Sequence, residues 1–317
     1  MRCPAASGSA TYTDASPCTW TRKLCVSCST VDSVVYITAQ TNGLPNHCHN
    51  STVNNNSASG SEWTVTWNAD MSGIENYADA DFDTSAETDE VLCDIQRTST
   101  SNLNAATTFS GDDAVTAGGL AITGTYIYNA LALGNADAVE GELETLDVCA
   151  SHPSPQGNHH YHYWGACMHK SRGHHSQTAV PDLCRDASGC LTSTNTYMRD
   201  SVNTVNTDYT YTAATYDTPI GLAKDGHVII GPYMSTGSVW TCDDRDVCNG
   251  ATISGSYVYV GSDTFPYMVG CWGPGPSTHT YMPTCTSTGC GTVVVSTGAV
   301  EQISAAIATL AVAAALF

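Results

Sequence analysis

Residues 157–164 read G-N-H-H-Y-H-Y-W, the centre of a segment that holds seven histidines between positions 152 and 175. Successive side chains of an extended chain point to opposite faces, so His160 and His162 share one face of a strand here. The opposite face carries His159, Tyr161 and Tyr163. Two imidazoles on one face are typical of a zinc or copper site.

Further strands are predicted on both sides of this segment. Short runs of β-branched and aromatic residues, bounded by turn-forming residues, favour strands over 34–38, 63–67, 125–128, 257–260 and 292–295. Asp225-Gly226 between apolar runs predicts a two-residue hairpin with Gly226 at positive φ. Residues 98–123 and 192–215 are rich in Thr, Ser, Asn and Ala, which favours long loops or edge strands. The expected fold is mainly β, a disulfide-rich, β-sandwich-like domain with long loops.

The chain has fifteen cysteines, which indicates an oxidising, extracellular or cell-surface location. Connectivity cannot be deduced from sequence, but several pairs are close enough to close small loops or to bracket the histidine segment. The odd count leaves one thiol for another chain, a missing partner or a free state. Cys25 and Cys28 are expected to pair elsewhere in the N-terminal segment, with Cys3 and Cys18. The short-range candidates are Cys184 with Cys190, Cys242 with Cys248, Cys285 with Cys290, and Cys149 with Cys167.

Charge and sequons agree with that location. Asn50 and Asn55 begin N-x-S/T acceptor sequences in a polar stretch, which predicts N-linked glycans there. Ten Lys plus Arg against thirty Asp plus Glu give a formal net charge of -20. Such a chain repels phosphate backbones and anionic lipid heads, so nucleic acid is not an expected partner.

The last fifteen residues, 303–317, are uncharged and consist mostly of strong helix formers. As a helix they span about 22 Å, less than the roughly 30 Å core of a bilayer. Two interpretations remain: a lipid-anchor signal, which is the one route to a membrane, or a retained apolar helix buried between subunits. The second makes the tail an assembly element, with its larger apolar side chains at Ile303, Ile307, Leu310, Val312, Leu316 and Phe317.

Six motifs occur in the order of a known family. The chain carries N-G-L-P-N-H (42–47), L-D-V-C-A-S-H-P (146–153), G-N-H-H-Y-H-Y (157–163), G-L-A-K-D-G-H-V-I-I-G-P (221–232), D-V-C-N-G (246–250) and Y-V-Y-V-x4-F-P-Y-x3-C (257–271). In this order they resemble the YHYH-domain family, with His159 where its signature has Tyr. The resemblance implies a secreted or surface domain and no particular reaction. The expected organisation is a Cys-rich segment (1–30), a YHYH-like β domain (31–275) and a C-terminal extension (276–317).

Two metal sites are conceivable. His160 and His162, with His152 and His47 as third and fourth ligands, would form a zinc or copper site, either closed and structural or open and catalytic. Stacked His and Tyr rings also pack and hydrogen-bond without an ion, and that alternative stays open. An acidic segment has the ligand spacing of a calcium loop, although Thr84 stands where such loops have Gly, and a solvated acidic loop explains it equally. Its candidate ligands are Asp79, Asp81, Asp83 and Glu90.

No nucleophile motif stands out, since the chain lacks G-x-S-x-G and H-E-x-x-H. The function expected from the tail, the odd cysteine and the cross-linking is a secreted structural protein that assembles with copies of itself into a fibre or surface layer. A metal-dependent extracellular enzyme centred on His160 and His162 is one rival hypothesis. A lipid-anchored binding protein is the other.

Overall fold

The structure is a computed structural model of the 317-residue chain. It describes residues 6–11, 19–46, 60, 62–68, 91–92, 108–109, 117–132, 136–138, 142, 145–146, 149–165, 168, 219–235, 238–240, 244–262 and 265–275. Strand makes up 49% of this part and helix 6%, which confirms the mainly β prediction.

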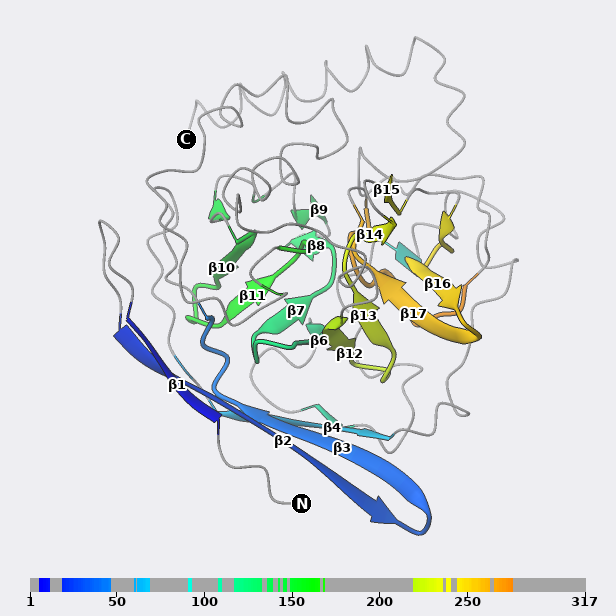
Figure 1. Cartoon of the computed structure of the whole chain (residues 1–317). Helices are drawn as coiled ribbons and strands as arrows, with labels where there is room; N and C mark the ends of the chain where they lie inside the picture. The colour runs from blue at the N-terminus through cyan, green and yellow to red at the C-terminus, as the bar shows by residue number, and fades with distance from the viewer. Residues whose placement is uncertain are drawn as a thin grey trace, which may run out of the picture.

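One sheet has five antiparallel strands in sequence order (Figure 1). Its second and third strands form a long hairpin that continues past the rest of the fold. The second strand also crosses residue 30, where the sequence predicted a domain boundary. The strands are β1 (Ala6–Thr11), β2 (Thr19–Val31), β3 (Val34–Thr41), β4 (Trp63–Asn68) and β5 (Thr108–Phe109).

The larger sheet has eight strands in the order β10-β11-β7-β6-β12-β13-β17-β16, in which β11 runs parallel to β7 and β13 parallel to β17. Two short hairpins, β8–β9 and β14–β15, lie outside it. The strands are β6 (Ala117–Ala121), β7 (Tyr126–Tyr128), β8 (Leu131–Ala132), β9 (Ala136–Asp137), β10 (Ser151–Pro153), β11 (His159–Tyr161), β12 (Pro219–Ala223), β13 (Val228–Ile230), β14 (Tyr233–Ser235), β15 (Ser238–Val239), β16 (Gly250–Ile253) and β17 (Ser256–Val260).

Most predicted strands are confirmed. β3, β4, β7 and β17 form where β-branched and aromatic residues alternate. β12 and β13 form a hairpin around Asp225-Gly226 as predicted, and Gly226 has φ of +101°. The loop has three residues and not the predicted two, because Ala223 pairs with His227 across the turn. The strand predicted over 292–295 lies outside the described residues.

The prediction of a loop or edge strand over 98–123 is wrong for its last part. Residues 117–121, A-G-G-L-A, form β6, which lies inside the large sheet between β7 and β12. Small residues are needed here, because a Cβ at Gly119 would lie 2.6 Å from the carbonyl oxygen of Leu222. Glycine is uncommon in strands, so the sequence pattern did not predict β6. The glycines are present because the backbones of β6 and β12 pack closely.

The large sheet buries both of its faces. On one face Leu120, Tyr126 and Tyr128 pack with Trp63 and Trp67 of the five-stranded sheet. The Trp63 ring stacks on Tyr126 with centroids 3.9 Å apart, and the Trp67 indole donates a hydrogen bond to the Ala223 carbonyl. The opposite face belongs to a larger core cluster that includes Ile127, Tyr161, Tyr163, Ile229 and Tyr259.

The cysteines depart from two expectations. Cys248 bonds to Cys271 and not to Cys242, because the end of the β16–β17 hairpin brings residue 271 against the turn before β16. Cys28 is an exposed thiol and not a disulfide partner. It is three residues from Cys25 on β2, so the two side chains point to opposite faces and cannot bridge. Cys149 is disulfide-bonded.

Several predicted features lie outside the described residues. They are the sequons at Asn50 and Asn55, the acidic segment from Asp79 to Glu90, and the apolar tail 303–317. Among the described residues, no helix has the length and apolar character to span a bilayer.

Candidate metal centre

Two neighbouring strands bring three histidines together at one edge of the large sheet. β10 and β11 are antiparallel, and their register places His152 directly opposite His160. His162 follows β11 and lies on the same side as His160, as the period-2 alternation predicts. The side chains of His159, Tyr161 and Tyr163 are buried elsewhere: Tyr161 and Tyr163 lie in the larger core cluster, and the His159 ring contacts the Ser151 hydroxyl at 2.9 Å.

Glu142 completes the group. One ligand atom from each of Glu142, His152, His160 and His162 lies within 4.8 Å of the others, so these four residues could hold a metal ion. Glu142 Oε2 is 3.3 Å from the Nε2 atoms of both His152 and His162, and the Nε2 atoms of His160 and His162 are 3.0 Å apart. Four ligands placed 2.0–2.1 Å from a tetrahedral zinc ion lie about 3.3 Å from one another.

Hydrogen bonds on the far side of each ring fix which nitrogen faces the centre. His160 Nδ1 contacts the Asn158 carbonyl at 3.0 Å, and His162 Nδ1 contacts the Asn129 carbonyl at 2.7 Å. A carbonyl oxygen only accepts, so both Nδ1 atoms carry a proton and donate it outward.

The His152 ring is oriented in the same way, but its Nδ1–H group has a hydroxyl as its partner. The Thr145 hydroxyl donates its single proton to the Glu142 carbonyl at 2.7 Å. It therefore accepts a hydrogen bond from His152 Nδ1, 2.8 Å away. All three histidines thus point an Nε2 lone pair inward, with Nδ1–H groups held as the outer partners of metal-bound histidines usually are.

Three lone pairs and a carboxylate oxygen at such distances repel one another unless a cation lies between them. A proton can serve, but the ring that takes it becomes a buried imidazolium. Burial and the neighbouring His152 and His162 lower the pKa of His160 well below its ordinary value, which opposes that charge. A divalent metal would instead be bound by every inward lone pair at once.

Electrostatics also keep Glu142 ionised. Burial raises the pKa of its carboxyl group, but a proton on Nε2 of His152 or His162 would bring a hydrogen bond and a charge that outweigh burial and hold this pKa below its usual value. A metal ion in place of such a proton would be met by three neutral imidazoles and one anion.

Aromatic packing holds the rings in place. The Tyr128 ring stacks on His160 with centroids 3.9 Å apart and meets His162 edge-on at 5.6 Å. The side chains of His152 and His162 are 6% and 4% exposed, while Glu142 is 28% exposed. The three imidazoles are therefore buried, and Glu142 is the most exposed member of the group.

Three of the four members were expected from the sequence. His152, His160 and His162 come together as expected, whereas His47 lies outside the described residues and stays a prediction. Glu142 was missed because it lies outside any strand, so no periodicity links it to the histidines. One available signal was its place in an acidic run ten residues before His152.

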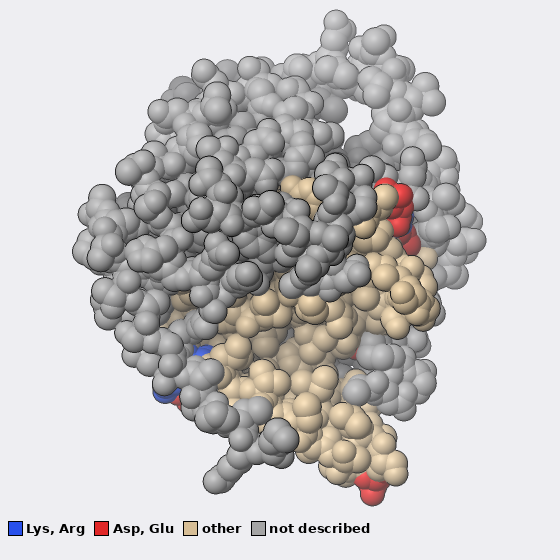
Figure 2. Space-filling view, in the orientation of Figure 1, with Lys and Arg blue, Asp and Glu red and all other residues tan. Residues whose placement is uncertain are grey.

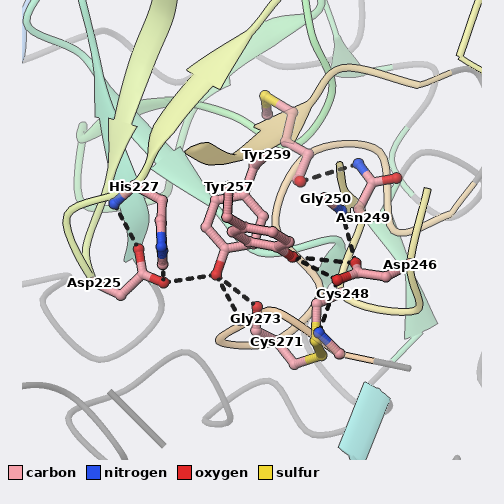
Figure 3. The surroundings of a disulfide bond; sticks show 12 residues. Asp225, His227, Asp246, Cys248, Asn249, Gly250, Tyr257, Tyr259, Cys271 and Gly273 are labelled. Carbon is pink, nitrogen blue, oxygen red and sulfur yellow. Dashed lines mark hydrogen bonds and ion pairs between the residues drawn. A yellow bond between two sulfur atoms is a disulfide. The ribbon is translucent and has the colours of Figure 1, made fainter. Parts of the chain in front are cut away.

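A second buried polar network lies in the turn between β12 and β13 (Figure 3). Asp225 is fully buried and accepts three hydrogen bonds: from the His227 backbone amide, from the His227 ring at 2.9 Å and from the Tyr259 hydroxyl at 2.7 Å. The same hydroxyl accepts a hydrogen bond from the Gly273 amide. Burial, with the charge of Asp225, raises the pKa of Tyr259 well above its usual value.

Asp246 has a similar set of partners beside the Cys248–Cys271 disulfide (Figure 3). The amides of Gly250 and Gly275 and the hydroxyl of Tyr257 all donate to its carboxyl group, at 2.7–3.1 Å. Burial raises the pKa of Asp246 despite these bonds. A Cβ at Gly250 or at Gly273 would lie 2.0 Å from the Tyr257 hydroxyl oxygen, so the ring fits only between two glycines.

Similarity to other proteins adds nothing to this geometry. The chain matches no protein-family model, no curated protein and no solved structure.

Proposed function

We propose that this chain is a metal-binding protein whose β domain holds one divalent transition-metal ion through Glu142, His152, His160 and His162. The supporting observation is the orientation of the three imidazoles, each of which donates its Nδ1–H away from the centre and turns Nε2 inward. In a cluster that served packing alone, we would expect at least one imidazole to turn an N–H group toward a neighbouring ring and to donate a hydrogen bond to its nitrogen.

Zinc is the ion that this geometry favours. The three ligand-to-ligand distances of 3.0–3.3 Å are close to the edge of a zinc-centred tetrahedron. Copper(II) is the second candidate, since it binds imidazole nitrogen more tightly than zinc does. The proposed fold around the ion is β-sandwich-like, because the two sheets share one apolar cluster.

Metal content tests this proposal. The full chain, purified after secretion and dialysed against buffer with equimolar Zn²⁺ and Cu²⁺ in separate samples, is expected to retain about one ion per chain. His160→Asn is expected to lose it. His159→Asn is the matched control. It also removes an imidazole from β11, but the His159 ring contacts the Ser151 hydroxyl and not the cluster. Retention of the metal by H160N, or none by the wild type, would reject the proposal.

Location and family are proposed from the sequence alone. We propose an extracellular or surface protein of the YHYH type, N-glycosylated at Asn50 and Asn55. The Cys248–Cys271 disulfide and the disulfide-bonded Cys149 are consistent with an oxidising compartment. Mass spectrometry of secreted material before and after glycosidase treatment tests the sequons, and an unmodified Asn50 and Asn55 would contradict them.

Self-assembly is the second proposed function. Residues 303–317 supply an apolar tail, and Cys28 supplies an exposed thiol on a strand that extends beyond the main fold. Most described residues on the face drawn in Figure 2 are uncharged.

Electron microscopy of the native protein and of a chain ending at residue 302 tests assembly. Filaments or layers that are lost on truncation are the expected result. Dispersed particles in both samples would reject it. Cys28→Ser separates the two contributions, since it removes the thiol and leaves the tail.

A further inference from the structure

The four members of the metal cluster are not held equally. His152, His160 and His162 are each fixed by an Nδ1 hydrogen bond, and their side chains are at least nine-tenths buried. A turn of any of these rings would break that bond and, for His160, the stacking on Tyr128. These three ligands form a rigid set on one side of the centre.

Glu142 differs in every respect. Its facing oxygen, Oε2, is shielded from solvent, but its side chain is 28% exposed. Thr145 binds the Glu142 backbone carbonyl and not the carboxylate. Among the described residues, the carboxylate contacts only His152 and His162, both at 3.3 Å. Rotation about the side-chain torsions of Glu142 thus frees one ligand position without moving a strand.

We propose that Glu142 is an exchangeable ligand, and that the metal held by the three histidines takes up a small anion or a carboxylate-bearing molecule in its place. This inference rests on the proposed metal site and adds that its fourth position opens to solvent.

Charge selects the class of ligand. Three neutral imidazoles leave the full double charge of the metal uncompensated when the Glu142 carboxylate moves away. An unbalanced charge is costly where the three ligands are shielded from water, so the incoming molecule has to bring a negative oxygen or nitrogen donor. Three fixed protein ligands with one open position is also the architecture of zinc sites that activate water or bind a substrate.

Cobalt(II) replacement gives a direct measurement of this exchange. The visible absorption of Co²⁺ depends on its coordination number, so Co²⁺ is the probe of the metal site. Sodium azide and acetohydroxamate are the probes of the open position. The wild-type full chain is expected to bind one Co²⁺ and to show a saturable spectral change with each anion.

The variant Glu142→Gln removes the internal competitor and keeps the side-chain size. It is expected to retain Co²⁺ on the three histidines and to bind azide about tenfold more tightly than the wild type. Glu62→Gln is the matched control, because Glu62 is an exposed carboxylate that pairs with Lys23 and is not a member of the histidine cluster. Its azide affinity is expected to equal that of the wild type.

The outcomes separate this inference from the proposed function. Loss of Co²⁺ from E142Q, or a wild-type spectrum that azide leaves unchanged, overturns the exchange and leaves the metal site standing. Failure of the wild type to bind Zn²⁺ or Co²⁺ overturns both. Because the wild-type titration needs no variant, the inference is decided even if E142Q does not fold.

Discussion

The Glu142–His152–His160–His162 cluster and the Asp225–His227–Tyr259 network are both buried groups of polar side chains in the same sheet, yet their hydrogens are arranged in opposite ways. In the network, two N–H groups and one O–H group converge on one carboxylate. In the cluster, the hydrogens point outward and the lone pairs face one another. The first arrangement is complete within the protein, whereas the second would be completed by a cation.

The two regions also lie at the same end of the sheet. Tyr161 pairs with Ile127, Ile127 with Gly119, and Gly119 with Ala223, in strands whose directions make β11, β7 and β12 point the same way. The segments that follow Tyr161 and Ala223 therefore leave the sheet on one side, three strand spacings or about 14 Å apart. The two regions therefore share a position in the fold. They differ in the balance of hydrogen-bond donors and acceptors, which separates a stabilising network from a binding site.

The largest expected effect is on stability, from Asp225→Ala. This change leaves the amide and ring N–H groups of His227 without their acceptor, and leaves the Tyr259 hydroxyl only the longer hydrogen bond to the Cys271 carbonyl. We expect it to cost about 4 kcal/mol of unfolding free energy. Urea denaturation measures it, and Asp244→Ala, at an exposed position, is expected to cost less than about 0.5 kcal/mol. Folded D225A is expected to keep its metal. Equal stability of the two variants would show that the network contributes nothing.

Chelation is expected to have the next largest effect, and only on the histidine cluster. A site loaded at a few hundred times its dissociation constant contributes about 3 kcal/mol, so EDTA lowers the unfolding free energy by that amount. Thermal unfolding with and without EDTA provides the measurement. The H160N variant should not respond, and a similar response there would assign the effect to another site.

Lys224, next to Asp225, gives the hairpin turn its own pH response. Burial lowers the pKa of Lys224 to about 8, so between pH 8 and about 10 the unfolded chain binds more protons than the folded one. Stability therefore rises with pH in this window, by about 2 kcal/mol. Above it, the raised pKa values of Tyr257 and Tyr259 reverse the slope, because only the unfolded tyrosines ionise.

Lys224→Met tests that response. Urea titrations of wild type and K224M at intervals across the window are expected to give a rising curve for the first and a flat one for the second. A slope that persists in K224M would place the titrating group elsewhere.

The smallest expected effect comes from Thr145→Val, which removes the acceptor of the His152 Nδ1–H group. Loss of such an outer hydrogen bond weakens metal binding about tenfold. Competition with a chromophoric chelator measures the affinity. Thr38→Val is the matched control, because it removes a threonine hydroxyl paired with Thr66 on the five-stranded sheet. Equal affinities in the two variants would mean that Thr145 does not orient His152.

Local patterns predicted the parts of the fold that depend on local chemistry. The alternation through His160, Tyr161 and His162 set which side chains share a face, and Asp225-Gly226 set a hairpin, because neighbouring residues determine both. β6 could not be predicted, because its glycines are required only by the close approach of the neighbouring strand β12.

The candidate site shows the same division. The histidines on β10 and β11 could be found, because they share one motif-rich segment. Glu142 could not be found, since it lies outside any strand and its place beside His152 and His162 follows no sequence period. The donors around Asp225 were missed for a related reason: Tyr259 is 34 residues away in sequence, and the strands β13 and β17 bring it close.

Two of the three contacts that orient the imidazoles are main-chain carbonyls, those of residues 129 and 158. Every amino acid supplies such an oxygen, so mutation at these two positions can change the side chain without erasing the contact. Homologues could then diverge widely around the histidines while preserving the chemistry of the centre. A search for relatives would do better to look for the spacing of the ligands along the backbone than for conserved neighbours.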